Sequence, residues 1–313
     1  VNIIDFIINP VNHVNPVYLS LFGGVAMDPV VTCRDLRKDY GRKRVLTGVD
    51  LEVPAGSVFA LLGTNGAGKT TLIRIILGLL PKSGGEIRVL GEEPYRFGPD
   101  LRQRIGYVSE EQGLYPWMTV QGLIGFCRSL YTQWDEAFVE RYLERFGLER
   151  WARVRALSHG QRVKLALILA LAPRPELLVL DEPMSGLDPL AQYEFLQVVV
   201  REISREGRTI FFSTHILADV EAVAERVAIL HGGRIQACGT LDEVRALVRK
   251  VSVRSDGRPL PPAGHVLHWE GGGGVVLAPA EGLAEVAAAG EILREEPASL
   301  EEAFIYFCGR GSG

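Results

Sequence analysis

Continuous apolar runs divide the chain into buried strands. Such runs occupy residues 58–62, 105–108, 177–180, 209–213 and 226–230. Segments that favour helices lie between them, and strands that alternate with helices form a mostly parallel sheet. The pattern therefore predicts an α/β fold.

Two further patterns lie outside these runs. Short alternating segments over residues 30–53, separated by glycine and proline turns, predict antiparallel strands, and residues 86–90 predict another. Apolar residues recur at i, i+3 and i+4 from residue 120 to about 146, which predicts helix. A further helix is predicted from residues 157–161 to 172, where Pro173 and Pro175 follow.

The composition shifts near residue 250. Residues 251–254 alternate like a strand, residues 281–289 favour a helix, and residues 300–307 close the ordered pattern. We interpret residues 246–313 as a small α+β accessory domain. A domain of this size is only marginally stable alone, so we expect it to pack against its neighbour. The main domain is then residues 28–245, with a helical subdomain at about 110–172.

Residues 1–27 differ from the rest. Residues 1–26 hold one acid, Asp5, and no Lys or Arg, so the basic region of a secretory signal is lacking. We interpret 1–27 as an extension outside the functional fold, from an upstream start or a cloning remnant. The alternative is a membrane-surface segment, which would lack the basic face typical of such helices.

Bulk composition limits the class of protein. The 313 residues carry a net charge of −4, which gives no sign of a nucleic-acid partner. The four cysteines are far apart in sequence and are interpreted as reduced intracellular thiols. The longest interior apolar run, residues 165–172, is too short to span a bilayer. We expect a soluble chain whose membrane role depends on a partner.

The segment after the first buried strand has the chemistry of a phosphate-binding loop. It matches G-x-x-x-x-G-K-[ST] and reads Gly63, Thr64, Asn65, Gly66, Ala67, Gly68, Lys69, Thr70, Thr71. Its glycines let the backbone wrap an anion with inward N–H groups, and the following helix adds its positive N-terminal end. Lys69 is expected to reach the β- and γ-phosphates, and the Thr70 hydroxyl to ligate Mg²⁺.

Further motifs follow in a fixed order. They are Ser158-His159-Gly160-Gln161, the strand of residues 177–182 that ends in Asp181 and Glu182, Ser185-Gly186-Leu187-Asp188, and Thr214-His215. Together with the phosphate loop, they make residues 30–240 resemble the nucleotide-binding subunit of ATP-binding-cassette (ABC) transporters. The resemblance implies a P-loop NTPase cassette with a RecA-like core, an antiparallel β subdomain and a helical subdomain.

Phosphoryl transfer requires a phosphate cradle, a metal and a placed water. With Lys69 in the cradle and Thr70 on the metal, Asp181 is expected to bind Mg²⁺ through water. Glu182 is the expected general base, and His215 would hydrogen-bond the γ-phosphate. The alternatives are a solvated strand end for the two acids and a packing role for the histidine.

The resemblance implies that a second cassette completes the site. Residues 158–161 resemble the family's signature sequence, whose helix faces the phosphates bound by the other subunit, and residues 185–188 resemble its dimer-contact loop. Ser158, Gly160, Gln161 and Asp188 are therefore expected to contact nucleotide in the assembled dimer. The expected partner is a second copy or a paralogous cassette. Tyr40 is expected to stack on the base, or else to pack at a strand end. The sequence contains no Asn-Lys-x-Asp motif, which guanine specificity usually requires, so we expect the nucleotide to be ATP.

Two positions depart from the family pattern. Glu110 stands where the family usually has a magnesium-binding Gln, with Gln112 nearby, and His159 replaces a signature glycine. Glu110 can still bind the metal but adds negative charge near the phosphates. His159 adds bulk and a titratable group.

Loop 114–119 and the following helices correspond to the region where the family docks its membrane subunit, and Trp117 is expected to contact a permease unless it caps the helical subdomain. The segment 297–304 resembles the C-terminal extension of export cassettes. The resemblance implies a cytoplasmic ATPase, peripheral on the membrane's inner face, that energises a separately encoded permease. The alternatives are a soluble non-transport cassette ATPase and a degenerate ATP-binding regulator.

Overall fold

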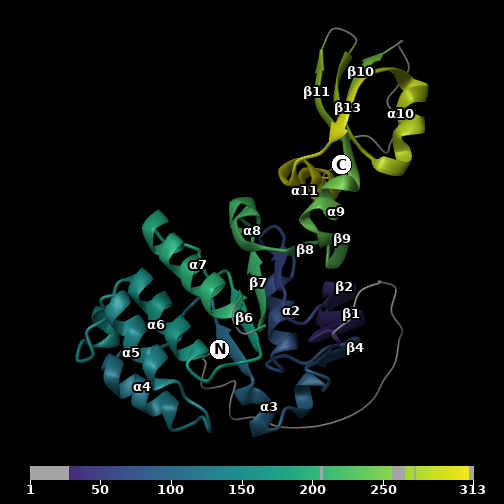
Figure 1. Ribbon diagram of the computed structural model, residues 1–313. Coiled ribbons are helices and arrows are strands. Elements are labelled where there is room, and N and C mark those ends of the chain that lie inside the picture. The colour runs from purple at the N-terminus through teal and green to yellow at the C-terminus, as the bar shows by residue number, and fades with distance from the viewer. Residues whose placement is uncertain (1–27, 205–206, 256–264, 271–272, 310–313) are drawn as a thin grey trace.

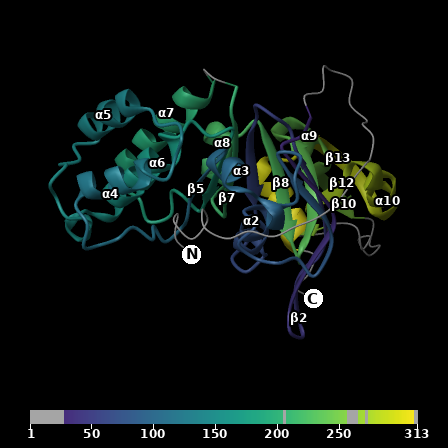
Figure 2. The ribbon, with the colours of Figure 1, turned by 90° about the horizontal axis from the view of Figure 1, so that it is seen from below.

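The computed structural model describes residues 28–204, 207–255, 265–270 and 273–309 (Figure 1). The extension expected at residues 1–27 lies outside them. Figure 1 shows a central sheet with helices at its sides, a helical group at one end and a separate C-terminal lobe. The helical group and the lobe lie at opposite ends of the cassette in Figure 2 as well.

The central sheet has the strand order β5-β6-β7-β3-β8-β9, and all its neighbours pair in parallel except β8 and β9. Its strands are β3 (Val58–Leu62), β5 (Ile105–Val108), β6 (Leu177–Asp181), β7 (Thr209–Thr214), β8 (Arg226–His231) and β9 (Arg234–Thr240). Flanking helices are α2 (Lys69–Ile76), α3 (Pro99–Gln103), α7 (Pro189–Ser204) and α8 (Leu217–Val223). Every residue of β3, β5, β6 and β7 is buried, which explains their continuous apolar runs and confirms the α/β prediction.

An antiparallel sheet packs beside the central sheet. Its order is β2-β1-β4, formed by β1 (Val31–Tyr40), β2 (Lys43–Val53) and β4 (Gly84–Val89). Tyr40 pairs with Lys43 across the turn that joins β1 to β2. A hydrophobic core that includes Leu36, Leu46 and Ile73 joins this sheet to α2 and β3.

The helical group contains α4 (Val120–Arg128), α5 (Glu136–Arg145) and α6 (His159–Leu171). The prediction of helix from residue 120 to 146 is wrong over residues 129–135, where the chain leaves the helix. The physical reason is at Asp135, whose side chain accepts a hydrogen bond from the Phe138 N–H and so caps the start of a new helix.

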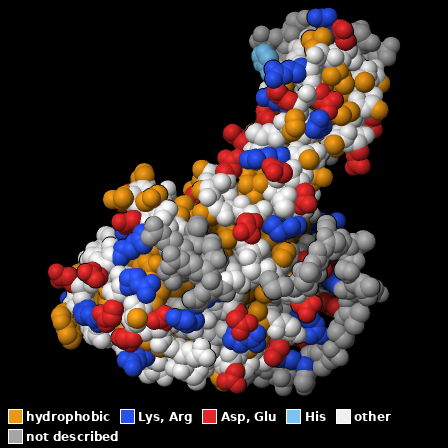
Figure 3. Space-filling view, viewed as in Figure 1, with side chains coloured by type: hydrophobic (Ala, Val, Ile, Leu, Met, Phe, Trp, Pro, Cys, Tyr) orange, Lys and Arg blue, Asp and Glu red, His pale blue; other side chains and the backbone are white. Residues whose placement is uncertain are grey.

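The C-terminal lobe follows α9 (Leu241–Ala246) and stands out from the cassette in Figure 3. Its sheet order is β11-β12-β10-β13, from β10 (Val248–Ser255), β11 (His265–Glu270), β12 (Gly273–Pro279) and β13 (Gly290–Pro297). Its helices are α10 (Leu283–Ala289) and α11 (Leu300–Gly309). Leu300 of α11 belongs to the same hydrophobic core as α6, so this helix anchors the lobe to the cassette.

Candidate functional site

The loop between β3 and α2 depends on its glycines. Gly66 and Gly68 have φ of 80° and 110°, values that side chains with a Cβ rarely adopt. A Cβ on Gly63 would lie 2.6 Å from the carbonyl oxygen of Leu230 on β8. The loop can therefore take this shape only with glycine at these positions, and it brings the first turn of α2 to the carboxyl ends of the parallel strands.

Lys69 folds back over this loop. Its side chain is 6% exposed, and Nζ donates to the carbonyl oxygens of Gly63 at 2.7 Å and Thr64 at 3.2 Å. The same ammonium lies 3.0 Å from Glu182 Oε1. A buried cation is thus held at the centre of the loop, where an anionic ligand would meet it.

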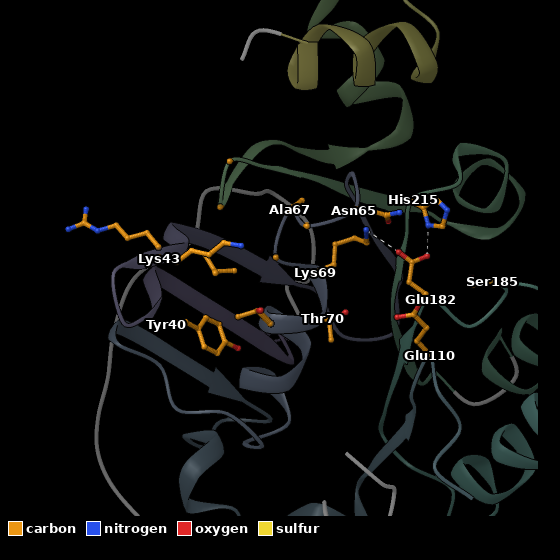
Figure 4. Close-up of a pocket in the computed structure, with 17 residues that line it drawn as sticks. Tyr40, Lys43, Asn65, Ala67, Lys69, Thr70, Glu110, Glu182, Ser185 and His215 are labelled. Carbon is orange, nitrogen blue, oxygen red and sulfur yellow. Dashed lines mark hydrogen bonds and ion pairs between the residues drawn. The ribbon is translucent and has the colours of Figure 1, made fainter. Parts of the chain in front are cut away.

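Glu182 follows β6 and is held between two other elements. Its backbone has φ of 47°, and its N–H donates to Ser213 Oγ on β7 at 3.0 Å. Its carboxylate faces Lys69 on one side and His215 on the other, with His215 Nδ1 2.8 Å from Glu182 Oε2. Figure 4 shows both contacts as dashed lines. The two expected catalytic side chains therefore touch, although 33 residues separate them in sequence.

Asp181 and Thr70 bring two hard oxygen ligands together. Thr70 Oγ1 donates to Asp181 Oδ1 at 3.3 Å, and Ser213 Oγ donates to the same oxygen at 2.6 Å. Burial raises the pKa of Asp181, and the hydrogen bonds from Ser213 and Thr70 oppose that rise. A hydroxyl and a carboxylate of this kind fit Mg²⁺, which keeps further water and phosphate oxygens as ligands.

A pocket of about 960 Å³ opens over the loop. Its lining includes the sequence-predicted residues Tyr40, Asn65, Gly66, Ala67, Gly68, Lys69, Thr70, Thr71, Glu110, Glu182 and His215. Tyr40 lies at the far end of the pocket from Glu182 (Figure 4), and the Lys38 ammonium sits 5.1 Å from the centre of its ring. The pocket therefore has an aromatic ring at one end and the carboxylate of Glu182 at the other.

Sequence reasoning missed part of this lining. Lys43, Arg44, Val45, Gly232 and Gly233 also line the pocket, as does Ser185 of the motif at residues 185–188. The two glycines form the turn between β8 and β9, and the N–H of Thr47 on β2 donates to the Gly233 carbonyl at 2.9 Å. That pairing joins segments far apart in sequence, so no local signal marks it.

The signature residues lie outside the pocket of their own chain. Ser158 caps α6, where its Oγ accepts from the Gln161 N–H at 3.2 Å and the Gln161 side chain accepts from the Ser158 N–H at 2.9 Å. Asp188 caps α7 by accepting from the Leu190 and Ala191 N–H groups, each at 3.0 Å. The side chains of Ser158, Gln161 and Asp188 therefore cap helices of their own chain. Gly160 lies on α6, between Ser158 and Gln161.

Within the described residues, two other features are absent: a clustered set of metal-binding side chains and a membrane-spanning helix. No group of three or more His, Cys, Asp or Glu side chains is arranged there to hold a metal ion. None of the helices in these residues combines the length and the apolar character that crossing a bilayer requires.

Comparison with known proteins shows the family to which the chain belongs. The family model described as ABC transporter matches residues 46–185. The chain is 37% identical over 250 residues to the ABC transporter ATP-binding protein YhaQ of Bacillus subtilis, covering 77% of this chain and 83% of that protein. It is 37% identical over 224 residues to the daunorubicin resistance ATP-binding protein DrrA3 of Streptomyces coeruleorubidus, covering 70% and 71%.

Other matches extend the comparison to structures. The bacitracin transport ATP-binding protein BcrA of Bacillus licheniformis is 31% identical over 226 residues, covering 72% of this chain and 74% of BcrA. A solved ATP-binding subunit of an ABC transporter superposes with a TM-score of 0.61 at 34% identity, covering 69% of this chain and 92% of that one. The chain therefore belongs to the family of ABC transporter ATP-binding proteins.

Proposed function

We propose that this chain hydrolyses ATP to ADP and phosphate and thereby energises a separate membrane permease. The observation that carries the proposal is the buried Glu182 carboxylate, held between Lys69 and His215 beside the phosphate loop. The loop N–H groups and Lys69 bind the phosphates. Thr70, Asp181 and Glu110 hold Mg²⁺, which when bound offsets phosphate charge.

Glu182 acts as the general base. It takes a proton from a water whose oxygen bonds to the γ-phosphorus, while the bond from that phosphorus to the bridging oxygen of ADP breaks. Lys69 exchanges its contacts with Glu182 and the loop carbonyls for the phosphates, which frees the carboxylate for the water. His215 holds the γ-phosphate from the other side of Glu182. Tyr40 stacks on the adenine.

A second copy of the chain, or a paralogous cassette, completes the site with Ser158, Gly160 and Gln161, while the Asp188 loops meet at the dimer interface. Support comes from Gly160, where a Cβ would lie 3.5 Å from Ala191 Cβ, an ordinary contact distance. The chain's own packing therefore does not require glycine at this position. Glycine is instead required here because a bound phosphate and a partner subunit approach this position closely.

The permease docks on the loop around Trp117. Trp117 is 62% exposed and stacks on Tyr115, with ring centres 4.9 Å apart, and Tyr115 in turn packs edge-on against Phe126 at 6.0 Å. Tyr115 therefore links the exposed Trp117 ring to the helical group. Aromatic side chains presented in this way are typical of protein interfaces. The chain then works at the cytoplasmic face of a membrane.

Export is the proposed direction. Two relatives are named for bacitracin transport and daunorubicin resistance, and the C-terminal lobe accords with the resemblance to export cassettes.

Glu182→Gln tests the hydrolytic function. This variant should bind ATP with Mg²⁺, release no phosphate and accumulate as a dimer in size-exclusion chromatography. Phosphate release at the wild-type rate would refute the assigned mechanism and favour a different base.

The alternative of an ATP-binding regulator rests on Glu110, whose carboxylate lines the same pocket as Glu182. Glu110→Gln decides between the two. For an ATPase slowed by the extra charge, the variant should hydrolyse ATP at least as fast as wild type. A regulator would show no phosphate release in either form, with the permease present.

A further inference from the structure

His159, the first residue of α6, contacts the loop that leads from β6 to α7. Its Nε2 lies 3.1 Å from the Ser185 carbonyl oxygen. A carbonyl oxygen can only accept, so Nε2 carries the hydrogen and donates it. The ring also lies beside Gly186, where an added Cβ would be 3.5 Å from Nε2.

The same loop holds the backbone of Glu182. The Ser185 N–H donates to the Glu182 carbonyl oxygen at 3.1 Å, which closes a turn over residues 182–185. Glu182 needs such support because its φ of 47° is unfavourable for a residue with a side chain. Two consecutive hydrogen bonds therefore connect the His159 ring to the backbone that presents the Glu182 carboxylate.

We propose that His159 is a positioning residue that fixes the 182–185 turn of its own chain and so directs the Glu182 carboxylate. The inference rests on the proposed ATPase function, in which Glu182 is the base. It also means that neighbouring residues act on the sites of different subunits. Ser158 and Gly160 serve the nucleotide of the partner subunit, whereas His159 serves the site of its own chain.

Three variants test the hydrogen bond in the full-length protein. His159→Leu removes the donor, and kcat for ATP should fall on the order of ten-fold with the Kd for ATP unchanged. His159→Gln keeps an amide donor at a similar reach and should restore most of the rate. Lys164→Ala is the matched control, because Lys164 pairs with Glu194 and so joins α6 to α7 without touching the turn. Equal losses in His159→Leu and Lys164→Ala would reduce the role to helix packing and overturn the inference.

Mixed dimers, isolated through two different affinity tags, separate action in the same chain from action across the interface. When His159→Leu is paired with Glu182→Gln, the intact Glu182 lies on the chain without His159, and we expect low activity. When the chain carrying both substitutions is paired with wild type, the remaining site keeps its own histidine and should retain its rate. The reverse pattern would show that His159 acts on the partner.

A crystal structure of His159→Leu gives a readout independent of turnover. We expect the Ser185 carbonyl and the backbone of Glu182 to shift relative to wild type. An unchanged turn would overturn the inference whether or not the protein hydrolyses ATP. Absence of hydrolysis in wild type with a shifted turn in the variant would instead reject the proposed function alone.

Discussion

The ammonium of Lys69 lies 3.0 Å from the carboxylate of Glu182, and the two side chains are only 6% and 8% exposed. The loop lysine and the acid at the end of β6 therefore form a buried ion pair. Removing one partner of a buried pair leaves the other charge without compensation, which costs more than removing both.

This pair predicts strong energetic coupling. Lys69→Met and Glu182→Gln, alone and combined, should give a coupling of about 1–3 kcal/mol in the free energy of unfolding without nucleotide. Urea denaturation followed by circular dichroism measures it. The exposed pair Arg104–Glu176, at 2.6 Å, is the control and should couple by less than about 1 kcal/mol. Equal coupling in the two pairs would mean that burial adds nothing at Lys69.

Asp219 on α8 predicts a pH dependence of stability. Burial raises its pKa above the ordinary 3.8, a rise opposed by the hydrogen bond that Thr214 Oγ1 donates. Because the folded state holds this proton more tightly than the unfolded state, the ionised carboxyl costs stability as the pH rises above 3.8.

Asp219→Asn removes that cost. The variant should melt at a higher temperature than wild type at pH 7.5, and the gain should shrink as the pH is lowered toward about 4. Differential scanning fluorimetry across this range tests the sign. A gain that is constant with pH would contradict the assignment to Asp219.

Lys43 is predicted to add a cation to the nucleotide site. It lines the pocket and pairs with Tyr40 across the turn, whereas the neighbouring Arg42 is absent from the lining. Lys43→Ala should weaken ATP binding by about three- to ten-fold, which corresponds to roughly 1 kcal/mol. Titration with a fluorescent ATP analogue measures the loss, and it should diminish at high salt. Arg42→Ala is the matched control. An equal loss of ATP affinity in Arg42→Ala would mean that positive charge anywhere near the site has this effect, and would contradict a specific role for Lys43.

Trp117 is predicted to matter for assembly but not for nucleotide binding. Trp117→Ala should reduce co-purification of the permease and leave the Kd for ATP unchanged, because the side chain is exposed and lies outside the pocket lining. Leu267→Ala, which removes an exposed apolar side chain of the C-terminal lobe, is the control. If the Trp117→Ala variant co-purified the normal amount of permease, the docking surface would have to lie elsewhere on the chain.

The C-terminal lobe shows where local pattern fails. The alternation of residues 251–254 predicts β10, but no local pattern predicts β11, β12 or β13. In β13, Gly290–Pro297, charged residues outnumber apolar ones, so its sequence carries little strand signal. It is a strand because it pairs with β10 along its length. The apolar periodicity likewise predicts helix across residues 129–135, but Asp135 caps the start of a new helix there.

Sequence patterns alone were enough to identify the phosphate loop, the buried parallel strands and the acids at the end of β6. These depend on local requirements: glycines at left-handed φ, continuous apolar runs, and the residue types that phosphate and Mg²⁺ need. Three other features follow from the folded arrangement of the chain: Lys69 contacts Glu182, Gly232 and Gly233 line the pocket, and His159 contacts Ser185. Those contacts join segments separated by 26 residues for the histidine and 113 for the buried pair. No local pattern encodes them, because they exist only when the sheet brings its strand ends together.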